Sequence, residues 1–503
     1  MKLKFLIPFL LIGSMSFAQG NSQKLDSIFN SLFAYGQING NILVAEDGLP
    51  IYKKSFGYSN FETKTLHTEN SIFSLASISK VFTSLAILQL KEKGKLKLDD
   101  LVLKYLKDFP YHDITIRNLL SHTSGLPDYD IFEEPINSNP NKIFTNKDVL
   151  PALIVWKKPL EFKPNEKWGY SNINYNLLAL IVENITGKTF QEYVGKNIFV
   201  PANMTNTFFK TDSVALRGKN KSENYVYPTL YSSKLQNVDS LERFRWNVFN
   251  LRGIKGQGNI ISNTEDMLKF DQVLYSGKLL KTSTLEEAFI PTKLTSGANA
   301  DANIGIGETS YGLGWFIFDD NTNGKIVWHT GGVPGALSIL LRNIDKKQTV
   351  ILLDNTASAG LYKNGVNAMN ILNKKPIVTT KQSLTRIYGG TLVDKGIDNA
   401  FVKFVELRED TSHFHLREDD MNELGYELLN RAIFNGHNDL ALEVFRQNIL
   451  LFPNNYNPYD SYGEALAKVG KKNEAIIMFR KSIQLNPDNE GGKKILEELL
   501  KKK

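Results

Sequence analysis

The chain has 503 residues, which is too long for one compact hydrophobic core, so we expect at least two domains. Hydrophobic residues make up 42% of the chain and charged residues 22%, as in an ordinary globular protein. The formal net charge of +7 is small for this length and argues against a nucleic-acid partner. The lack of cysteine excludes thiol catalysis, disulfides, zinc–cysteine sites and iron–sulfur clusters.

The first residues have the features of a cleavable signal peptide. Lys2 and Lys4 precede an apolar run, and Ser16-Phe17-Ala18 places small residues before a cleavage point at Gln19. The apolar run is shorter than the roughly 20 residues that span a bilayer, so no stable membrane span is expected. We predict a signal peptide over residues 1–18 and export to the periplasm or the medium, between which the sequence does not decide.

The following residues predict strands at both ends of a domain, with helices between them. Residues 42–45 and 51–56 are β-rich and flank Asp47-Gly48, the pattern of a hairpin. An apolar helix is expected over residues 77–93, ending at Gly94. Residues 313–354 predict a meander of four strands, with turns at 321–324, 332–334 and 343–347. An antiparallel sheet flanked by helices, an α/β (α+β) fold, is therefore predicted over residues 19–375.

A helical pattern with a period of 34 residues follows over residues 376–503. The matching pairs are Gly436 and Gly470, Ala441 and Ala475, Phe445 and Phe479, and Pro453 and Pro487. This spacing resembles the tetratricopeptide repeat, in which stacked helix pairs bury an apolar face. We expect an all-α repeat domain that offers a surface to a protein partner. Ordinary helical hairpins without a partner surface are the alternative.

Three short motifs occur in one order along the predicted sheet domain: Ser77-Ile78-Ser79-Lys80, Tyr170-Ser171-Asn172 and His329-Thr330-Gly331-Gly332. The first is the only S-x-x-K in the chain, and the third is the only H-x-G. Residues three apart lie on one face of a helix, so Ser77 and Lys80 can meet as a nucleophile and its base. A serine N-cap followed by a surface lysine is the alternative, which the other two motifs make less favoured.

The three motifs together resemble those of the class C β-lactamases, the D-Ala-D-Ala peptidases and the family VIII esterases. Residues 119–127 (LLSHTSGLP), 201–207 (PANMTNT) and 311–315 (YGLGW) also resemble segments of these enzymes. The resemblance covers about residues 25–372. It implies the same antiparallel sheet flanked by helices, with Ser77 opening a helix beside it. It also implies catalysis without a metal or another cofactor.

The resemblance implies a second proton carrier at Tyr170. Y-x-N occurs three times, at Tyr58, Tyr170 and Tyr362, and Tyr170 alone precedes a helical run in the expected place. Asn172 is expected to bridge Lys80 and a substrate amide oxygen, with a helix cap as the alternative. Whether Lys80 or Tyr170 takes the first proton stays open at this point.

The third motif supplies the substrate-binding residues His329, Thr330, Gly331 and Gly332. The resemblance implies an oxyanion hole made by the N–H groups of Ser77 and Gly332. His329 stands where many β-lactamases have lysine; because it is mostly neutral at pH 7, it should hold a substrate carboxylate less firmly.

Two further candidates are weaker. His122 belongs to a segment that looks structural. The glycines of residues 256–259 are explained equally well by a turn.

These observations predict an exported serine hydrolase that forms an acyl-enzyme on Ser77. The expected partner in the reaction is a small-molecule or peptide substrate with an amide, lactam or ester bond, and a peptidase or esterase is favoured. A true β-lactamase is one alternative. The other is a ligand-sensing protein whose repeats bind a partner. One scaffold hosts many chemistries, so the motifs do not choose the substrate.

Overall fold

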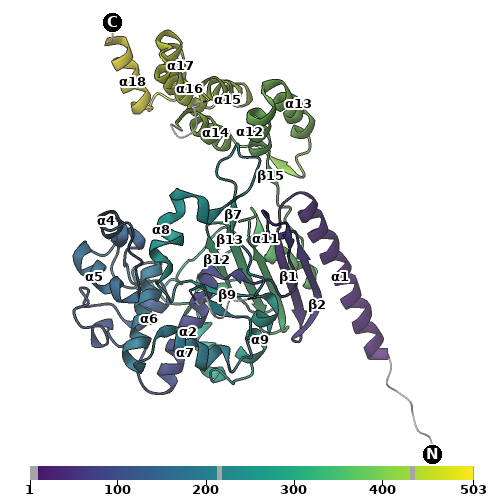
Figure 1. Cartoon of the computed structure of the whole chain (residues 1–503), viewed down its shortest axis with the longest axis vertical. Coiled ribbons are helices and arrows are strands. Elements are labelled where there is room, and N and C mark those ends of the chain that lie inside the picture. The colour runs from purple at the N-terminus through teal and green to yellow at the C-terminus, as the bar shows by residue number, and fades with distance from the viewer. Residues whose placement is uncertain (1–8, 212–217, 431–436, 502–503) are drawn as a thin grey trace, which may run out of the picture. The chain divides into compact units, whose positions relative to one another are not determined.

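The computed structural model describes residues 9–211, 218–430 and 437–501 (Figure 1). It has two compact units: Met1–Val226 with Asn237–Val378, here called the sheet unit, and Tyr227–Gln236 with Thr379–Lys503, here called the helical unit. The start of the predicted signal peptide and the repeat position Gly436 lie outside the described residues. The predicted domain boundary at residue 375 stays a prediction.

In the described residues of the sheet unit, seven strands form one antiparallel sheet, as predicted. Their spatial order is β10 (Thr309–Tyr311), β11 (Phe316–Phe318), β12 (Ile326–Val333), β13 (Ala336–Asn343), β14 (Gln348–Asp354), β1 (Gly40–Glu46) and β2 (Leu49–Phe56). The predicted hairpin is confirmed, since Asp47 (φ 49°) and Gly48 (φ 77°) both adopt the left-handed backbone that a two-residue hairpin turn requires. The first and the last of the seven strands in chain order, β1 and β14, pair with each other.

The turn between β12 and β13 differs from the prediction. Residues 332–334 were expected to turn, but β12 continues to Val333, which pairs with Ala336. The turn is made by Pro334 and Gly335, because glycine accepts the left-handed conformation (φ 73°) that closes it. As a result, Gly331 and Gly332 belong to a strand and not to a loop.

Alternate residues of the sheet serve two separate hydrophobic cores. Ile42 and Val44 of β1 face one core, together with residues of α1 (Phe9–Ala34) and α11 (Leu361–Leu372). Leu43 and Ala45 face the other, where α9 (Thr264–Leu274) and α2 (Ser79–Glu92) pack. Figure 1 shows α1 running beside β2. This period of two is what a sheet covered on both faces requires.

The helix α2 runs through the larger of these two cores. Every residue from Ser79 to Leu90 is buried. A 3₁₀ turn, η1 (Ala76–Ile78), precedes it, and Gly94 (φ 65°) follows it. The helix predicted over residues 77–93 is thus confirmed, with its first turn wound more tightly. Ser77 lies in that turn.

Shorter elements complete the sheet unit. Its other helices are α3 (Ile116–Leu120), α4 (Glu133–Ser138), α5 (Asn146–Trp156), α6 (Asn172–Thr186), α7 (Phe190–Val194), α8 (Arg245–Val248) and α10 (Thr282–Ala288). Its short strands include β3 (Tyr58–Asn60), β4 (Thr65–Leu66), β5 (Phe73–Ser74), β6 (Phe208–Phe209), β7 (Tyr225–Val226) and β9 (Ile260–Ser262). Of these, β9 pairs with both β5 and β6 and so holds the chain just before η1.

The helical unit is built mainly from helices that follow one another along the chain. They are α12 (Leu384–Lys395), α13 (Ile397–Arg408), α14 (Glu418–Asn430), α15 (Asn438–Leu451), α16 (Tyr456–Lys468), α17 (Lys472–Leu485) and α18 (Glu490–Lys501). Two short parallel strands, β15 (Gln382–Ser383) and β16 (Phe414–His415), were not foreseen. Four of the predicted repeat positions are fully buried: Ala441, Phe445, Ala475 and Phe479.

The segment Tyr227–Gln236 joins this unit from far away in the sequence. Its Leu230 N–H donates to the Glu427 carboxylate at 2.6 Å, and the Arg386 guanidinium lies 3.9 Å from the Tyr227 ring centroid. β7 and β8 (Gln236–Asn237) bracket this segment. Part of the chain between the second and third motifs therefore belongs to the helical unit.

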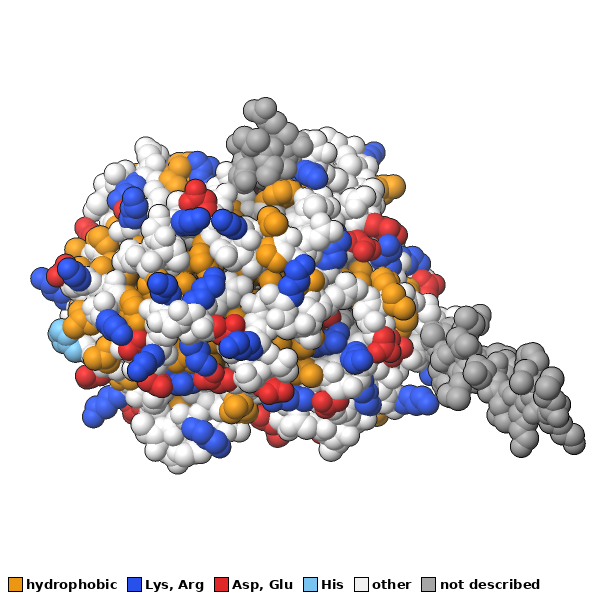
Figure 2. Space-filling view, turned by 90° about the horizontal axis from the view of Figure 1, so that it is seen from below, with side chains coloured by type: hydrophobic (Ala, Val, Ile, Leu, Met, Phe, Trp, Pro, Cys, Tyr) orange, Lys and Arg blue, Asp and Glu red, His pale blue; other side chains and the backbone are white. Residues whose placement is uncertain are grey.

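The surface mixes charges of both signs. Figure 2 shows basic and acidic side chains interspersed on the face it presents, with apolar side chains between them. Among the described residues, no helix combines the length and apolar character needed to cross a membrane.

Candidate active site

Ser77 lies in a turn that two neighbouring strands hold in place. Ala76 adopts φ 46°, an uncommon conformation for a residue with a side chain. The Ser338 hydroxyl donates to the Leu75 carbonyl oxygen at 2.8 Å, which fixes the turn against β13. A Cβ atom on Gly331 would lie 2.1 Å from that same oxygen, so only glycine lets β12 approach so closely. The third motif therefore packs against the backbone that immediately precedes the first motif.

Lys80 is fully buried beneath Ser77. Its Nζ donates to Ser77 Oγ at 3.2 Å, to Asn172 Oδ1 at 2.7 Å and to the Gln257 carbonyl oxygen at 3.0 Å. Burial lowers the pKa of Lys80 to about 7, although the charge of Asp128 opposes the shift. A substantial fraction of the amine is therefore neutral near pH 7, as a base requires.

Asn172 is held by an aspartate that the sequence did not single out. It is the first residue of α6, and its backbone N–H and its Nδ2 donate to the two oxygens of Asp128 at 2.8 and 3.0 Å. Because a carboxylate only accepts hydrogen bonds, the amide must turn its Oδ1 toward Lys80. Asp128 follows the segment 119–127 directly, but nothing in the sequence separated it from Asp130, two residues on.

Tyr170 lies against Lys80. Its ring centroid is 4.7 Å from Lys80 Nζ and 4.3 Å from that of His122. Burial raises the pKa of Tyr170 well above its usual value, and a hydrogen bond with Ser77 only partly opposes this. The phenol therefore keeps its proton at neutral pH.

The two other Y-x-N tyrosines have different surroundings. Tyr58 pairs with Leu66 at the β3–β4 hairpin. Tyr362, on α11, donates its hydroxyl hydrogen to the Gly331 carbonyl oxygen at 2.9 Å. It therefore adjoins the third motif, which its distance along the chain did not suggest.

His122 is a buried neutral imidazole. Its Nδ1 accepts from the Ser171 N–H at 3.2 Å and lies 3.1 Å from the Asn174 amide nitrogen. Burial and the charge of Lys80 hold its pKa well below the usual range. These contacts fit the structural role expected of it, because they anchor the start of α6.

His329 is also buried, with 1% of its surface exposed. Its Nδ1 lies 2.6 Å from the Thr330 carbonyl oxygen and its Nε2 lies 3.3 Å from the Tyr311 hydroxyl. Burial and Lys80 lower its pKa to about 3, so the ring is uncharged at neutral pH. Gly332, three residues on, is exposed at the open side of the strand.

The glycine-rich segment 256–259 adjoins the same cluster. Gly256 has φ 105°, and a Cβ atom there would lie 2.3 Å from the Tyr175 carbonyl oxygen. This close approach brings the next carbonyl, that of Gln257, to Lys80. The segment was a weak candidate because glycines in a turn explained it equally well.

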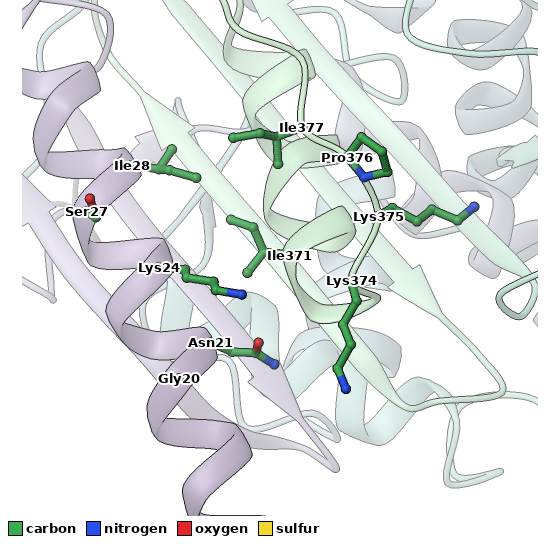
Figure 3. A pocket seen from close by; sticks show the side chains of 10 residues that line it. All are labelled: Gly20, Asn21, Lys24, Ser27, Ile28, Ile371, Lys374, Lys375, Pro376 and Ile377. Carbon is green, nitrogen blue, oxygen red and sulfur yellow. The ribbon is translucent and has the colours of Figure 1, made fainter.

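A separate pocket of about 660 Å³ lies between α1 and the end of α11 with the chain that follows it (Figure 3). Lys24, Ile28, Ile371 and Pro376 are among its lining residues, and none of the predicted site residues lines it. In the part of the chain that the structure describes, no group of three or more His, Asp or Glu residues is placed to hold a metal ion.

Comparisons with known proteins agree with this fold. The family model described as Beta-lactamase matches residues 25–365. The chain is 36% identical over 351 residues to penicillin-binding protein 4* of Bacillus subtilis, covering 69% of this chain and 75% of that protein. It is 28% identical to protein flp of Staphylococcus aureus, covering 67% and 64%. The chain therefore belongs to the beta-lactamase family, and these similarities support a serine hydrolase.

Solved structures show the same fold. A penicillin-binding protein from Bacillus halodurans has a TM-score of 0.57 at 27% identity, covering 68% of this chain and 98% of its own. The D-amino acid amidase from Ochrobactrum anthropi SV3 has a TM-score of 0.56 at 22% identity, with coverage of 71% and 98%. The likeness to the amidase concerns the fold alone.

Proposed function

We propose that the chain is an exported serine hydrolase that forms an acyl-enzyme on Ser77 with an amide, lactam or ester substrate. One observation carries the proposal: a fully buried lysine amine lies 3.2 Å from the Ser77 hydroxyl, and its pKa is lowered to about 7. A serine hydroxyl becomes an effective nucleophile when such a base adjoins it.

In acylation, neutral Lys80 takes the proton of Ser77 as Oγ attacks the substrate carbonyl carbon. The raised pKa of Tyr170 argues against a phenolate as the first base and favours Lys80. The oxyanion is held by the N–H groups of Ser77 and Gly332. When the bond to the leaving group breaks, Tyr170 gives its proton to the leaving nitrogen or oxygen and regains one from Lys80.

In deacylation, water attacks the ester carbonyl carbon, and the same groups remove its proton and return one to Ser77. Asn172 supplies an amide that Asp128 holds in one orientation. A peptidase or an esterase is favoured over a lactamase because His329 is uncharged where many lactamases have a cation. The names of two relatives, both penicillin-binding proteins, agree with this preference.

The test is intact-protein mass after separate incubation with penicillin and with a serine-directed aryl phosphonate. We expect adducts on the wild type and on Ser276→Ala, an exposed serine that serves as control, and none on Ser77→Ala. A lasting penicillin adduct would indicate a peptidase and a short-lived one a lactamase, while a phosphonate adduct alone would indicate an esterase. Folded wild-type protein that gives no adduct with either reagent would overturn the proposal.

Export and a partner are separate parts of the proposal. Cleavage after Ala18 would leave the rest of α1 on the mature protein, since this helix continues to Ala34. N-terminal sequencing of protein recovered outside the cytoplasm should begin at Gln19.

For the helical unit we propose a tetratricopeptide-like repeat that binds a protein. Its support is the burial of alanine and phenylalanine at matching positions 34 residues apart. Partner capture that survives Ser77→Ala while activity is lost would favour a sensing role over catalysis.

A further inference from the structure

A cavity of about 30 Å³ lies beside the Ser77 turn. Its wall nearest the nucleophile includes Ala76, the residue before Ser77, and Val333, the residue after Gly332. Each proposed oxyanion donor is therefore one residue away from the cavity wall. The rest of the lining is mixed: apolar residues such as Ile260 and Pro334 form part of it, and the polar part is made by two cations and several amides, among them Lys210, Arg252, Asn247 and Asn259.

The two basic residues lack ion-pair partners among the described residues. Asp239 and Glu223 act on Lys210 at longer range, but Glu223 is paired with Lys221 at 3.1 Å. Burial lowers the pKa of Lys210, and the positive charge of Arg252 adds to the shift. Two like charges that share a partly buried wall are unfavourable until an anion lies between them.

The position of the cavity relative to Tyr170 indicates which part of a substrate reaches it. Tyr170 contacts His122, whose ring centroid is 5.2 Å from that of Tyr311, and the Tyr311 hydroxyl lies 3.3 Å from His329 Nε2. The proposed proton donor to the leaving group is thus linked to the His329 end of the third motif through His122 and Tyr311. The cavity adjoins the other end, at Val333, so the acyl part of the substrate extends toward it.

We propose that this cavity is a subsite for a carboxylate on the acyl part of the substrate, bound by Lys210 and Arg252. Its volume admits a carboxylate but not a whole amino-acid residue. A guanidinium and an ammonium are the side chains that bind carboxylates most strongly. The inference rests on the proposed acyl transfer at Ser77. It adds the substrate class: amides or esters whose acyl part carries a free carboxylate close to the scissile carbonyl.

The experiment compares two aryl phosphonates that differ only at the end of the arm that mimics the acyl part, one ending in a carboxylate and the other in a primary carboxamide. The readout is the ratio of their second-order rate constants for labelling Ser77, followed by intact mass. For the wild type we expect the carboxylate to be favoured about tenfold or more, the factor for one charge-assisted hydrogen bond. The preference should weaken with added salt.

Lys210→Ala and Arg252→Gln should each bring the ratio close to one, whereas Lys210→Arg should keep it. The matched controls Lys219→Ala and Arg243→Gln change exposed cations that do not line the cavity, and should keep the wild-type ratio. Equal labelling of the wild type by both phosphonates would overturn the subsite and leave the nucleophile standing. Failure of both to label folded wild type would overturn the subsite together with the proposed function.

Discussion

Replacing Asp128 by asparagine should move the pH at which the enzyme becomes active. Asp128 is joined to Lys80, the proposed base, through the side chain of Asn172, by contacts of 2.7 and 3.0 Å. Its negative charge raises the pKa of Lys80, against the larger effect of burial. Asp128→Asn removes that charge, so the pKa of Lys80 should fall further below about 7 and the acidic limb of activity should move to lower pH.

The size of the shift follows from the geometry. Two charges separated by one amide group are about 6 Å apart, and at an effective dielectric constant of about 20 they interact with about 3 kcal/mol. That energy corresponds to about two pH units. Burial also raises the pKa of Asp128, which opposes ionisation of this carboxyl, so about two units is the upper limit of the expected shift.

The assay is the second-order rate constant for labelling of Ser77 by an uncharged aryl phosphonate, measured across the titration of Lys80. Asp130→Asn is the matched control, because Asp130 is exposed and lies two residues from Asp128. A purely structural role for Asp128 would lower the plateau and leave the midpoint of the limb in place. A midpoint that stays constant, or moves to higher pH, would refute the reasoning.

Three further changes test other parts of the structure. Tyr362→Phe removes the donor to the Gly331 carbonyl oxygen and should slow the labelling of Ser77 about fivefold, which is the value of one neutral hydrogen bond. The control Tyr58→Phe should leave the labelling rate unchanged. Equal labelling rates for the two variants would contradict this prediction. Gly331→Ala places a Cβ atom 2.1 Å from a backbone oxygen and should lower the melting temperature. In the control Gly195→Ala the added Cβ atom meets open space, so the melting temperature should not fall in the same way. Similar melting temperatures for the two variants would argue against the close approach at Gly331. Phe479→Ala empties a fully buried position of the helical unit and should cost about 3–5 kcal/mol in urea unfolding, which an unshifted midpoint would disprove.

Local sequence signals predicted much of the sheet. The β1–β2 hairpin follows from Asp47-Gly48 between two β-rich runs, and the buried α2 follows from its apolar residues. The end of β12 was misplaced, because Gly332 reads as a turn residue when the strand that pairs with it is unknown. Glycine in a strand marks a close approach of backbones, which only the tertiary structure identifies.

In the candidate site, too, local sequence signals predicted some residues, while others depend on tertiary contacts. Ser77 and Lys80 were singled out because helical spacing links them, and the structure brings them together with Tyr170 and Asn172. Asp128 was missed because its importance comes from a hydrogen bond to a residue 44 positions away. Nor did local sequence signals indicate that the segment 227–236 joins the helical unit, because that depends on contacts with residues more than 150 positions away.

Keeping the amine of Lys80 neutral in the folded protein has a cost in folding free energy, which the packing around it must offset. Lowering its pKa from 10.5 to about 7 makes the charged form less favourable in the folded state by about 5 kcal/mol. The unfolded chain binds the proton more tightly, so this effect lowers stability fully below pH 7 and disappears as the pH rises toward 10.5. The buried residues of α2 offset it by removing apolar surface from water. Without that packing, water would reach the amine and return its pKa toward the value of a free lysine, and Ser77 would lose the neutral amine that we propose as its base.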